Sequence, residues 1–571
     1  MAAPRAVSPT RLAILNTPNP ALVSHRAAQR LPRWALLLFC LAYVLPGVFG
    51  RDPWKSADIT AFGTMANMAQ GKVSWLAPTV AGLPTDGALL PYWIGGVAIK
   101  LLGGVIDPAL AARLPFALVL VLVLALTWYA TFHLARTDAA QPLPFAFGGE
   151  ASPSDYARAV ADGALLALIA TLGLLQLGHE TTPELLQLAG VALLMYGLAA
   201  RATPGRSSLW AVLLALPILA ASTAPTIALL LGATSVLVCW RSRFEPVRAL
   251  VPWVLLSTAL AAGLALFLGE WHWRVGGFGS LRQALAILRQ LAWFTWPTWP
   301  LALWTLWRWR RHLTDRHISI PLSIALVNLG AGVLMGGYDR ALLLALPALA
   351  VLASFALPTL QRSAAAAIDW FSVFFFSTAA IILWVVYVAM QTGIPKQPAA
   401  NVAKLAPGFV AHFSALPLML ALAGSFAWIW LVGWRTNRQR HPLWKSMVLP
   451  ASGVALAWLL LMTLWLPLLD YALSYRPLVQ RLAQQLPPHS CVAAPGMARA
   501  ELVALEYLGG WRVDAATPLN QSRCEFWLQV EPRKVAPAQR AGWRWVGEAS
   551  RPTDRADTTR IYRREPGAHA N

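Results

Sequence analysis

The sequence predicts an all-α polytopic membrane protein that carries a small α/β domain at its C-terminal end. Of its 571 residues, 57% are hydrophobic and only 12% are charged, and the mean hydropathy is +0.54. A soluble protein has about 25% charged residues, so a soluble fold is excluded. The apolar residues gather in long runs before residue 470, and the remainder of the chain is polar.

The distribution of positive charge sets the orientation of the chain. The net charge is +21, but the basic residues lie in short loops between apolar runs, as the positive-inside rule requires, so we exclude nucleic-acid binding. Residues 1–33 contain five arginines and no acidic residue, which places this tail in the cytoplasm. No small-residue cleavage pattern follows the first apolar run, which indicates a retained span and not a signal peptide.

Thirteen apolar runs are candidate spans, because a helix needs about 20 apolar residues to cross the hydrocarbon core. They are 34–50, 112–135, 162–178, 184–200, 208–221, 224–240, 248–269, 290–307, 317–336, 341–358, 369–390, 410–433 and 447–469. The continuous run 208–240 exceeds one span. Ser222, Thr223 and Pro225 in its middle predict a tight hairpin between two helices.

The segment 88–106 is apolar but is expected not to cross the bilayer. A crossing would place Lys100 inside the membrane at a cost of roughly 2.5–3.5 kcal/mol. Without that crossing, the loops expected in the cytoplasm after the second span hold sixteen Lys and Arg residues, and the opposite short loops hold six. We therefore expect an interfacial helix within an outer loop, 51–111, and a C-terminus outside the cytoplasm.

Residues 470–571 are expected to form a separate α/β domain on the outer face. Helical spacing occurs in 476–486 and 501–508, and strand patterns occur in 490–494, 524–530, 543–549 and 558–565. Cys491 and Cys524 lie at the starts of two of these strands. Adjacent parallel strands would bring them within disulfide distance, and an oxidising compartment would let the bond persist.

The sequence RDPWKSAD (51–58) directly follows the first span and is the first candidate for chemistry. An acidic residue there can take a proton from an acceptor, while Arg51 and Lys55 hold an anionic lipid headgroup. The simpler interpretation is that these charges anchor the end of the span. The sequence contains no GxGxxG, Walker or HExxH motif that would indicate a nucleotide or zinc enzyme.

The order of segments resembles the GT-C glycosyltransferases that use polyprenyl-phosphate sugars, among them the bacterial lipid A aminoarabinose transferases and the protein mannosyltransferases. The resemblance covers most of the chain. The segments that carry it are RDPWKSAD (51–58), AGLPTDGALLPYW (81–93), IDPALAARLP (106–115), GHETTPELLQLAG (178–190), FTWPTWPLALW (294–304), YDRALLLALP (338–347) and LWLPLLDYALSYRP (464–477).

This resemblance implies a GT-C-like fold, a polyprenyl-phosphate-linked sugar as donor and an envelope lipid, glycan or protein as acceptor, with lipid A modification as one instance. It implies a bacterial inner membrane, with the C-terminal domain in the periplasm. In the family, an Asp-Glu pair in the first outer loop carries the catalytic carboxylate. This chain has Ala57-Asp58 there, so Asp58 is the candidate base, and Asp52 is its rival.

The resemblance also suggests donor-binding residues. The family commonly has Glu-Lys-Pro where this chain has Asp86-Gly87-Ala88, so Lys55 or Arg340 is expected to substitute for the missing lysine. Arg340 alternatively serves as a cation that snorkels from a span end. The remaining candidates for substrate contact are Arg51, Asp86, His179, Glu180 and Tyr338. His179 and Glu180 could contact a metal or sugar, but polarity at a helix end also explains them; no cofactor is implied with certainty, and a divalent metal stays open.

Two function classes remain open from the sequence. The first is the glycosyltransferase. The second is a non-catalytic protein that binds or translocates a lipid-linked sugar, which the incomplete acidic pair and the absent lysine favour. A secondary transporter is a third option, but few charged residues lie within the spans.

Overall fold

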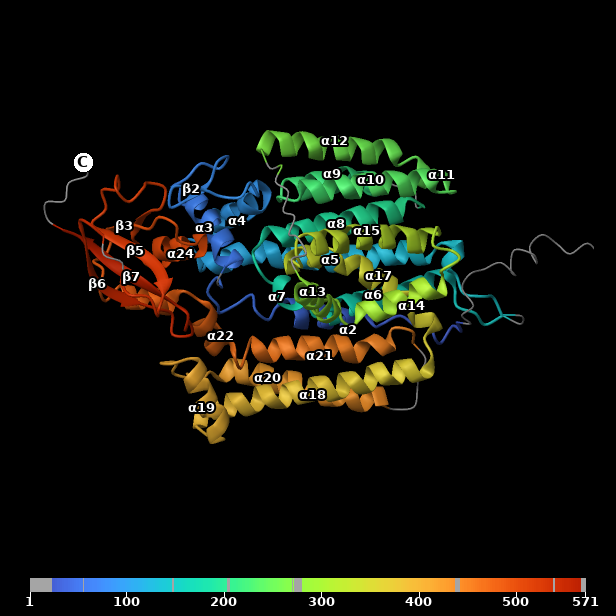
Figure 1. The fold of residues 1–571 in the computed structure, drawn as a ribbon. Helices are drawn as coiled ribbons and strands as arrows, with labels where there is room; N and C mark the ends of the chain where they lie inside the picture. Colours follow the sequence, from blue (N-terminus) through green and yellow to red (C-terminus); the bar gives the residue numbers. More distant parts are fainter. Residues whose placement is uncertain are drawn as a thin grey trace, which may run out of the picture.

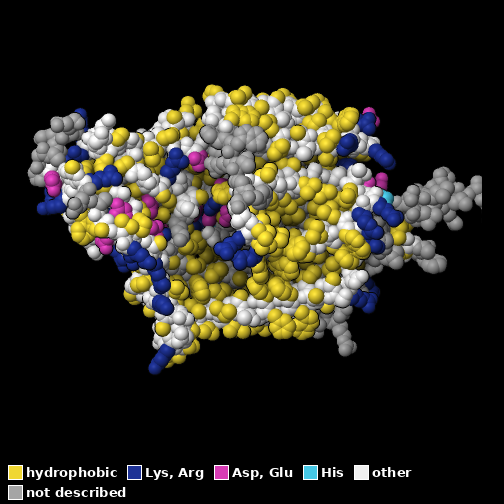
Figure 2. Space-filling view, viewed as in Figure 1, with side chains coloured by type: hydrophobic (Ala, Val, Ile, Leu, Met, Phe, Trp, Pro, Cys, Tyr) yellow, Lys and Arg dark blue, Asp and Glu magenta, His cyan; other side chains and the backbone are white. Residues whose placement is uncertain are grey.

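The computed structural model describes residues 23–565, except 55, 146–147, 203–205, 270, 272–279, 437–441 and 538–539. Lys55, an expected donor-binding residue, therefore lies outside the described residues. The chain folds as a bundle of helices, and a β-sheet domain made by the C-terminal residues sits at one end of it (Figure 1). The flank of the bundle is largely hydrophobic, with Lys and Arg side chains towards both ends (Figure 2).

Each of the thirteen predicted spans contains at least one helix. These helices are α2 (Arg33–Val44), α5 (Pro108–Ala135), α6 (Pro153–Ala170), α8 (Pro183–Ala199), α9 (Ser207–Ala220), α10 (Pro225–Arg241), α12 (Val251–Leu268), α14 (Thr298–Arg308), α15 (Arg316–Leu334), α17 (Leu346–Ser354), α18 (Arg362–Thr392), α20 (Ala415–Thr436) and α21 (Lys445–Leu461). Within the described residues, six spans, or seven with one bent pair, are long and apolar enough to cross a membrane unaided. The count of thirteen stays a prediction.

Further helices connect these or follow them. They are α3 (Ala57–Ala69), α4 (Leu89–Leu102), α7 (Leu174–Leu177), α11 (Glu245–Arg248), α13 (Leu281–Phe294), α16 (Asp339–Leu343), α19 (Lys396–Leu405) and α22 (Leu466–Leu473), with single 3₁₀ turns at Asp138–Ala140, Ala200–Ala202 and Leu357–Thr359. Helix α22 bends away from α21 by 71°. It therefore leads the chain out of the bundle towards the sheet (Figure 1).

The predicted hairpin within 208–240 is confirmed. Helix α9 ends at Ala220, a turn follows, and α10 begins with Pro225. Proline fits the first turn of a helix, because its missing N–H would have no intrahelical partner there. Thr223 takes a positive φ of 66° in the turn, which lets the chain reverse within a few residues.

The predicted single span 290–307 is wrong in detail. Helix α13 ends at Phe294, and α14 begins only at Thr298. Pro297 lacks a backbone N–H and disfavours helical geometry in the residue before it, so the helix breaks there. The loop after α6 occupies the break: the Gly173 N–H donates to the Phe294 carbonyl at 2.8 Å, and the Leu172 N–H donates to the Trp296 carbonyl at 3.1 Å.

Helix α4 occupies the segment that was expected to lie in the interface. Its 14 residues are about 21 Å long, which is shorter than the roughly 30 Å hydrocarbon core. It packs against α3 and the beginning of α5, and its Lys100 is exposed. That α4 lies in the interface stays a prediction, because α9, a predicted span, also has 14 residues.

The C-terminal residues form a mixed five-stranded sheet in the order β4-β3-β5-β7-β6. Strand β3 (Cys491–Ala493) runs parallel to β4 (Arg512–Asp514) and to β5 (Phe526–Pro532), and β7 (Asp557–Arg564) runs antiparallel to β5 and β6 (Trp543–Ala549). Helices α23 (Arg476–Leu482) and α24 (Arg499–Val503), with a π-helical turn over Ala504–Leu508, complete it. Of these elements, the sequence pattern missed only β4.

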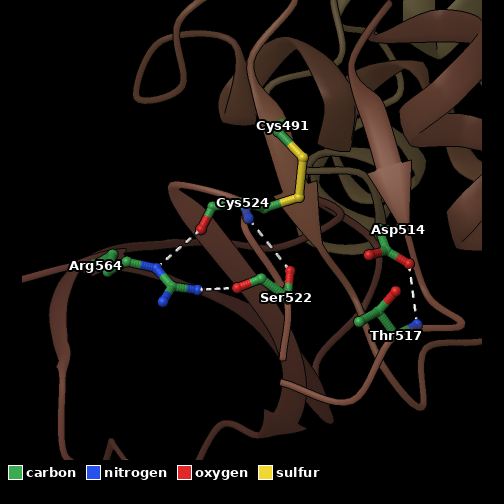
Figure 3. The surroundings of a disulfide bond; sticks show 6 residues. All are labelled: Cys491, Asp514, Thr517, Ser522, Cys524 and Arg564. Carbon is green, nitrogen blue, oxygen red and sulfur yellow. Dashed lines mark hydrogen bonds between the residues drawn. A yellow bond between two sulfur atoms is a disulfide. The ribbon is translucent and has the colours of Figure 1, made fainter. Parts of the chain in front are cut away.

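The predicted disulfide is present. Cys491 and Cys524 are bonded, with their Cα atoms 4.8 Å apart (Figure 3). Cys491 begins β3, and Cys524 shortly precedes β5, its parallel neighbour, as the sequence argument required. Arg564 at the end of β7 donates to the carbonyls of Ser522 and Cys524, so the turn that carries Cys524 is held from two sides.

The sheet domain contacts the bundle through the first outer loop. A short hairpin of β1 (Thr79–Val80) and β2 (Leu83–Pro84) lies between them, and the Ala515 N–H donates to the Ala81 carbonyl at 3.0 Å. Helix α3 packs on α24, where Phe62 meets Tyr507 edge to face and the Asn67 amide donates to Glu506 at 3.2 Å. The first outer loop therefore joins the bundle to the C-terminal sheet domain.

Candidate functional site

The segment from the end of α2 to the first turn of α3 carries both candidate bases. Gly47 turns the chain after α2 with a φ of +84°, and a Cβ at this position would lie 2.8 Å from the Trp458 ring. Glycine is therefore required on two counts, conformation and space. After this turn the Arg51 side chain donates back to the Gly47 carbonyl, and residues 52 and 54 donate to Asp470 in the segment that leads to the C-terminal domain.

Asp58 is enclosed in the first turn of α3 and is only 1% exposed. Its Oδ1 accepts hydrogen bonds from the N–H and hydroxyl of Thr181, each at 2.8 Å, and its Oδ2 accepts from Arg51 at 2.9 Å and from the Trp54 N–H at 3.2 Å. Burial opposes ionisation, but Arg51, Arg113 and the Thr181 bonds outweigh it and hold the pKa of Asp58 below its usual value. A carboxylate has about four acceptor positions, and all four are filled.

Arg51 is buried with Asp58 and ties three segments together. Its NH1 forms the ion pair, its NH2 donates to the His179 carbonyl at 2.7 Å, and its Nε donates to the Gly47 carbonyl at 2.8 Å. The guanidinium also lies 4.7 Å from the centre of the Trp54 ring. Each nitrogen of this expected phosphate-binding residue therefore already has a protein partner.

His179 contacts the Arg51–Asp58 ion pair through its carbonyl, which accepts from Arg51. Its Nδ1 lies 2.6 Å from the Leu175 carbonyl, and its Nε2 lies 2.9 Å from the Tyr43 carbonyl. Burial lowers the pKa of His179 to about 4, so the ring is neutral at pH 7. Both ring nitrogens face carbonyl oxygens, and the described residues contain no group of three His, Cys, Asp or Glu side chains suited to a metal. These residues do not fit a divalent metal site.

Arg340 lies in α16 and joins this helix to the segment 180–184. It forms an ion pair with Glu180, its NH1 donates to the Thr182 hydroxyl at 3.2 Å, and the same NH1 lies 3.7 Å from Glu184. The Tyr338 hydroxyl donates to Glu184 at 3.3 Å. Burial raises the pKa of Glu180, with Asp58 adding to the shift, although Arg340 opposes it. Arg340 thus holds the segment 180–184, whereas the sequence suggested either contact with the donor phosphate or a cation that snorkels from a span end.

Asp52 lies in a second cluster made largely by the start of the C-terminal domain. Arg476 pairs with both of its carboxylate oxygens, with Nε at 2.7 Å, and the Ser474 hydroxyl donates to it at 2.8 Å. The Asp52 N–H donates to Asp470 at 2.9 Å. Burial opposes ionisation, but Arg476 and Ser474 lower the pKa of Asp52. Its side chain is 14% exposed, so one edge remains open.

Two further charged residues near this loop were not identified from the sequence. Asp107 caps α5 by accepting from the Ala109 and Leu110 N–H groups at 2.9 and 3.0 Å. Arg113, one and a half turns later, is 4% exposed and makes a 3.4 Å bond to the Val48 carbonyl. Its NH2 meets no partner among the described residues. Both lie in the quoted IDPALAARLP segment, which is the one signal that pointed to them.

Asp86 lies elsewhere. Its side chain is 54% exposed and pairs with Arg499 of α24 at 3.2 Å, and Arg499 also donates to the Pro84 carbonyl. No described contact joins it to Asp52 or Asp58. The structure therefore brings together Arg51, Asp58, His179, Glu180, Tyr338 and Arg340, places Asp52 in the adjoining cluster and leaves Asp86 at the domain contact.

The helix bundle also contains an apolar cavity. A cavity of about 270 Å³ lies between α14 and α18 and is lined by residues such as Trp296, Trp304, Phe371 and Phe376. Figure 2 also shows a recess in the hydrophobic surface beside the C-terminal domain, below a group of Lys and Arg side chains, where Figure 1 draws α13 above α21.

No protein-family model and no curated protein matches the sequence. Solved structures do match the fold: the structure of ArnT from Cupriavidus metallidurans bound to undecaprenyl phosphate aligns with a TM-score of 0.59, covering 94% of this chain and 98% of that one. This chain therefore has the fold of ArnT, the GT-C lipid A aminoarabinose transferase. The apo ArnT structure gives a TM-score of 0.58 over 93% of this chain.

The similarity to ArnT runs through the whole molecule, including the C-terminal part, because nearly all of both chains align. Sequence identity is 14% to the bound ArnT and 12% to the apo form. At this identity the likeness to ArnT is one of fold, and residue roles must be argued from the geometry above.

Proposed function

We propose that the protein is a membrane glycosyltransferase that moves a sugar from a polyprenyl-phosphate donor to an envelope lipid, glycan or protein. The observation that carries this is the fold, which is shared over almost the whole chain with an ArnT structure bound to undecaprenyl phosphate. The buried acid and arginine cluster lies where the bundle meets the C-terminal domain. Chemistry on a lipid-linked sugar requires such a place, with apolar surface on one side and polar groups on the other.

Asp52 suits the role of base better than Asp58. The acceptor O–H must give its proton to the base as its oxygen bonds to the sugar C1, and the C1–O bond to the lipid phosphate breaks with its electrons going to the phosphate. Asp58 has all four acceptor positions filled and is buried. Asp52 accepts three bonds and keeps an exposed edge. We therefore propose that Asp58 holds the loop in place and that Asp52 is the base that takes the proton of the acceptor.

The departing phosphate needs a cation. Arg340 and Lys55 are the candidates, as the sequence suggested. Arg340 is shared between Glu180 and Glu184, and the raised pKa of Glu180 favours its protonation when another anion approaches. A phosphate could then take the place of one carboxylate on the guanidinium. The recess in the hydrophobic surface beside the C-terminal domain suits the polyprenyl chain (Figure 2).

The alternative is a protein that binds or translocates the lipid-linked sugar without transfer. One observation favours it: the acid at the family's catalytic position, Asp58, is fully saturated by protein donors. In this case Asp52 would serve only to hold Arg476.

A transfer assay with purified protein in proteoliposomes distinguishes the glycosyltransferase from the protein that only binds or translocates the donor. The probes are undecaprenyl phosphate carrying radiolabelled aminoarabinose or mannose, with an envelope lipid extract as acceptor. We expect label to move to the acceptor with wild-type protein and to fall at least about 100-fold with Asp52→Asn, since general-base catalysis contributes about that much or more. Specific binding of the donor without transfer would support the alternative. Normal transfer by Asp52→Asn would reject the assignment of the base.

A further inference from the structure

The segment Asp470–Arg476 links the last membrane helix to the C-terminal sheet, and it contacts the Asp52 loop at several points. We infer that this segment positions the base: Asp470 fixes the loop backbone, and Ser474 and Arg476 fix the carboxylate of Asp52. The inference rests on the proposed function, because it concerns how Asp52 is held for the transfer.

The contacts form a closed set around residues 52–54. Asp470 Oδ1 accepts from the Asp52 N–H at 2.9 Å and from the Trp54 indole at 3.1 Å, so one oxygen holds both a backbone and a side-chain group. Arg476 donates hydrogen bonds to both carboxylate oxygens of Asp52, and Ser474 donates to one of them. The Ser474 hydroxyl also accepts from the Arg476 N–H at 3.0 Å, which orders the segment itself.

The contacts from Asp470, Ser474 and Arg476 fix a loop that has few hydrogen bonds of its own. Residues 51–54 form no regular helix or strand, so their own backbone offers few hydrogen bonds to fix them. A proton acceptor misplaced by about 1 Å can cost 100-fold in rate, and sites on loops need supporting contacts to avoid this. A bidentate pair with arginine fixes the plane of the carboxylate as well as its position. Asp470, Ser474 and Arg476 therefore act through Asp52.

The contacts with Arg476 and Ser474 also lower the pKa of Asp52. The groups that face Asp52 are Arg476 and Ser474 from the segment, Asp470 beside its N–H and, at longer range, Arg113 from α5 and Tyr507 from the π-helical turn. The Arg476 side chain is 54% exposed, so the pair stands at the open edge of the site and is partly screened by solvent. Removing Arg476 takes away the main cation and leaves Arg113.

The arrangement makes the C-terminal domain part of the site. Arg476 is the first residue of α23, and α22 bends by 71° to bring Asp470 to the loop. A shift of the sheet domain against the bundle would therefore move the partners of Asp52 directly.

The test uses full-length protein with the variants Asp470→Ala, Asp470→Asn, Arg476→Ala and Arg476→Lys. The matched control is Arg563→Ala, which removes an exposed ion pair with Glu525 on the sheet, measured at 2.8 Å. The first measurement is amide hydrogen exchange of the peptide covering residues 50–54. We expect exchange at least roughly tenfold faster in Asp470→Ala, because the two hydrogen bonds that Asp470 Oδ1 accepts from Asp52 and Trp54 are lost. Asparagine retains the accepting oxygen, so Asp470→Asn should be close to wild type.

The second measurement is the pH dependence of transfer. Arg476→Ala should raise the pKa of Asp52 and move the acid limb of the profile up by about one unit or more, and Arg476→Lys should recover part of the shift. Unchanged exchange in Asp470→Ala, or an acid limb that stays in place in Arg476→Ala, would overturn the inference. If wild-type protein transfers no sugar, the proposed function fails, and hydrogen exchange alone still decides whether the segment anchors the loop.

Discussion

Arg51 and Asp58 form an ion pair whose side chains are each about 2% exposed, and a pair this deep behaves unlike one on the surface. Breaking it by removing one partner leaves the other charge buried and uncompensated, which costs about 3–5 kcal/mol. We predict that Asp58→Asn loses stability by this amount when unfolding is followed in detergent. Replacing both residues, as Arg51→Met with Asp58→Leu, should recover part of it. A loss in Asp58→Asn below about 1 kcal/mol would contradict this account.

The lowered pKa of Asp58 also predicts that the stability of the protein depends on pH. Its folded-state pKa is below the unfolded value of about 3.9, so it contributes stability that is present above that value and is lost as the pH falls through the folded pKa. The stability difference between wild type and Asp58→Asn should therefore be largest at neutral pH and should narrow below about pH 4. Unfolding curves at several pH values check this, and a difference that stays constant down to pH 3 would refute it.

The sequence could predict part of this site. Arg51 and Asp58 are seven residues apart at the end of a span, so their proximity followed from the local pattern. Their other partners are distant in the chain: Thr181 lies 123 residues from Asp58, and Arg476 lies 424 residues from Asp52. No local periodicity reports contacts of this range, so the saturation of Asp58 and the enclosure of Asp52 required the fold.

At the scale of elements, α3 meets α24 with no space between them. A Cβ on Gly63 would lie 2.2 Å from Cγ1 of Val503, so the two helices approach at a glycine. We predict that Gly63→Ala destabilises the contact between the bundle and the C-terminal domain by about 1–3 kcal/mol, because overpacking forces the helices apart. Proteolysis of the detached domain or thermal unfolding would measure it.

A second substitution separates this packing effect from a general effect of alanine. Val503→Ala in the Gly63→Ala background should restore part of the stability, since it removes Cγ1 and Cγ2, which lie 2.2 and 2.5 Å from the added Cβ, and leaves only the Val503 Cβ at 2.9 Å. The control is Gly330→Ala in α15, where a Cβ meets nothing within 4 Å. Equal losses in the Gly63 and Gly330 variants, or no recovery in the double variant, would show that close packing is not the cause.

The elements show why some sequence patterns were sufficient and others were not. Ser222, Thr223 and Pro225 marked the hairpin because polar and proline residues interrupted an apolar run that was too long for one span. The break at Pro297 stands in a run of tryptophans and prolines, which is equally apolar on both sides, so hydropathy did not reveal it. In the C-terminal domain, β4 has only three residues and no alternation long enough to detect.

At the scale of the whole molecule, the topology depends on α4. If it lies in the interface, residues on either side of it face the same compartment. We predict that single cysteines replacing Leu76 and Val105, which are 68% and 88% exposed, both label with an impermeant reagent from outside the cell. A cysteine at Thr137 should label only after permeabilisation. Labelling of positions 76 and 105 from opposite sides would show that α4 crosses and would invert every later loop.

The disulfide ties this topology to the stability of the C-terminal domain. Cys491 and Cys524 are separated by 33 residues, and closing a loop of that size stabilises the fold by roughly 3–4 kcal/mol on the chain-entropy model. Such a bond persists in an oxidising compartment, so its presence in protein taken from cells would support a periplasmic domain. Non-reducing mass spectrometry should find the two peptides linked, while Cys40 and Cys239 are alkylated once the protein is unfolded. Four alkylated thiols in protein purified without reductant would contradict both the bond in the cell and the outer location of the domain.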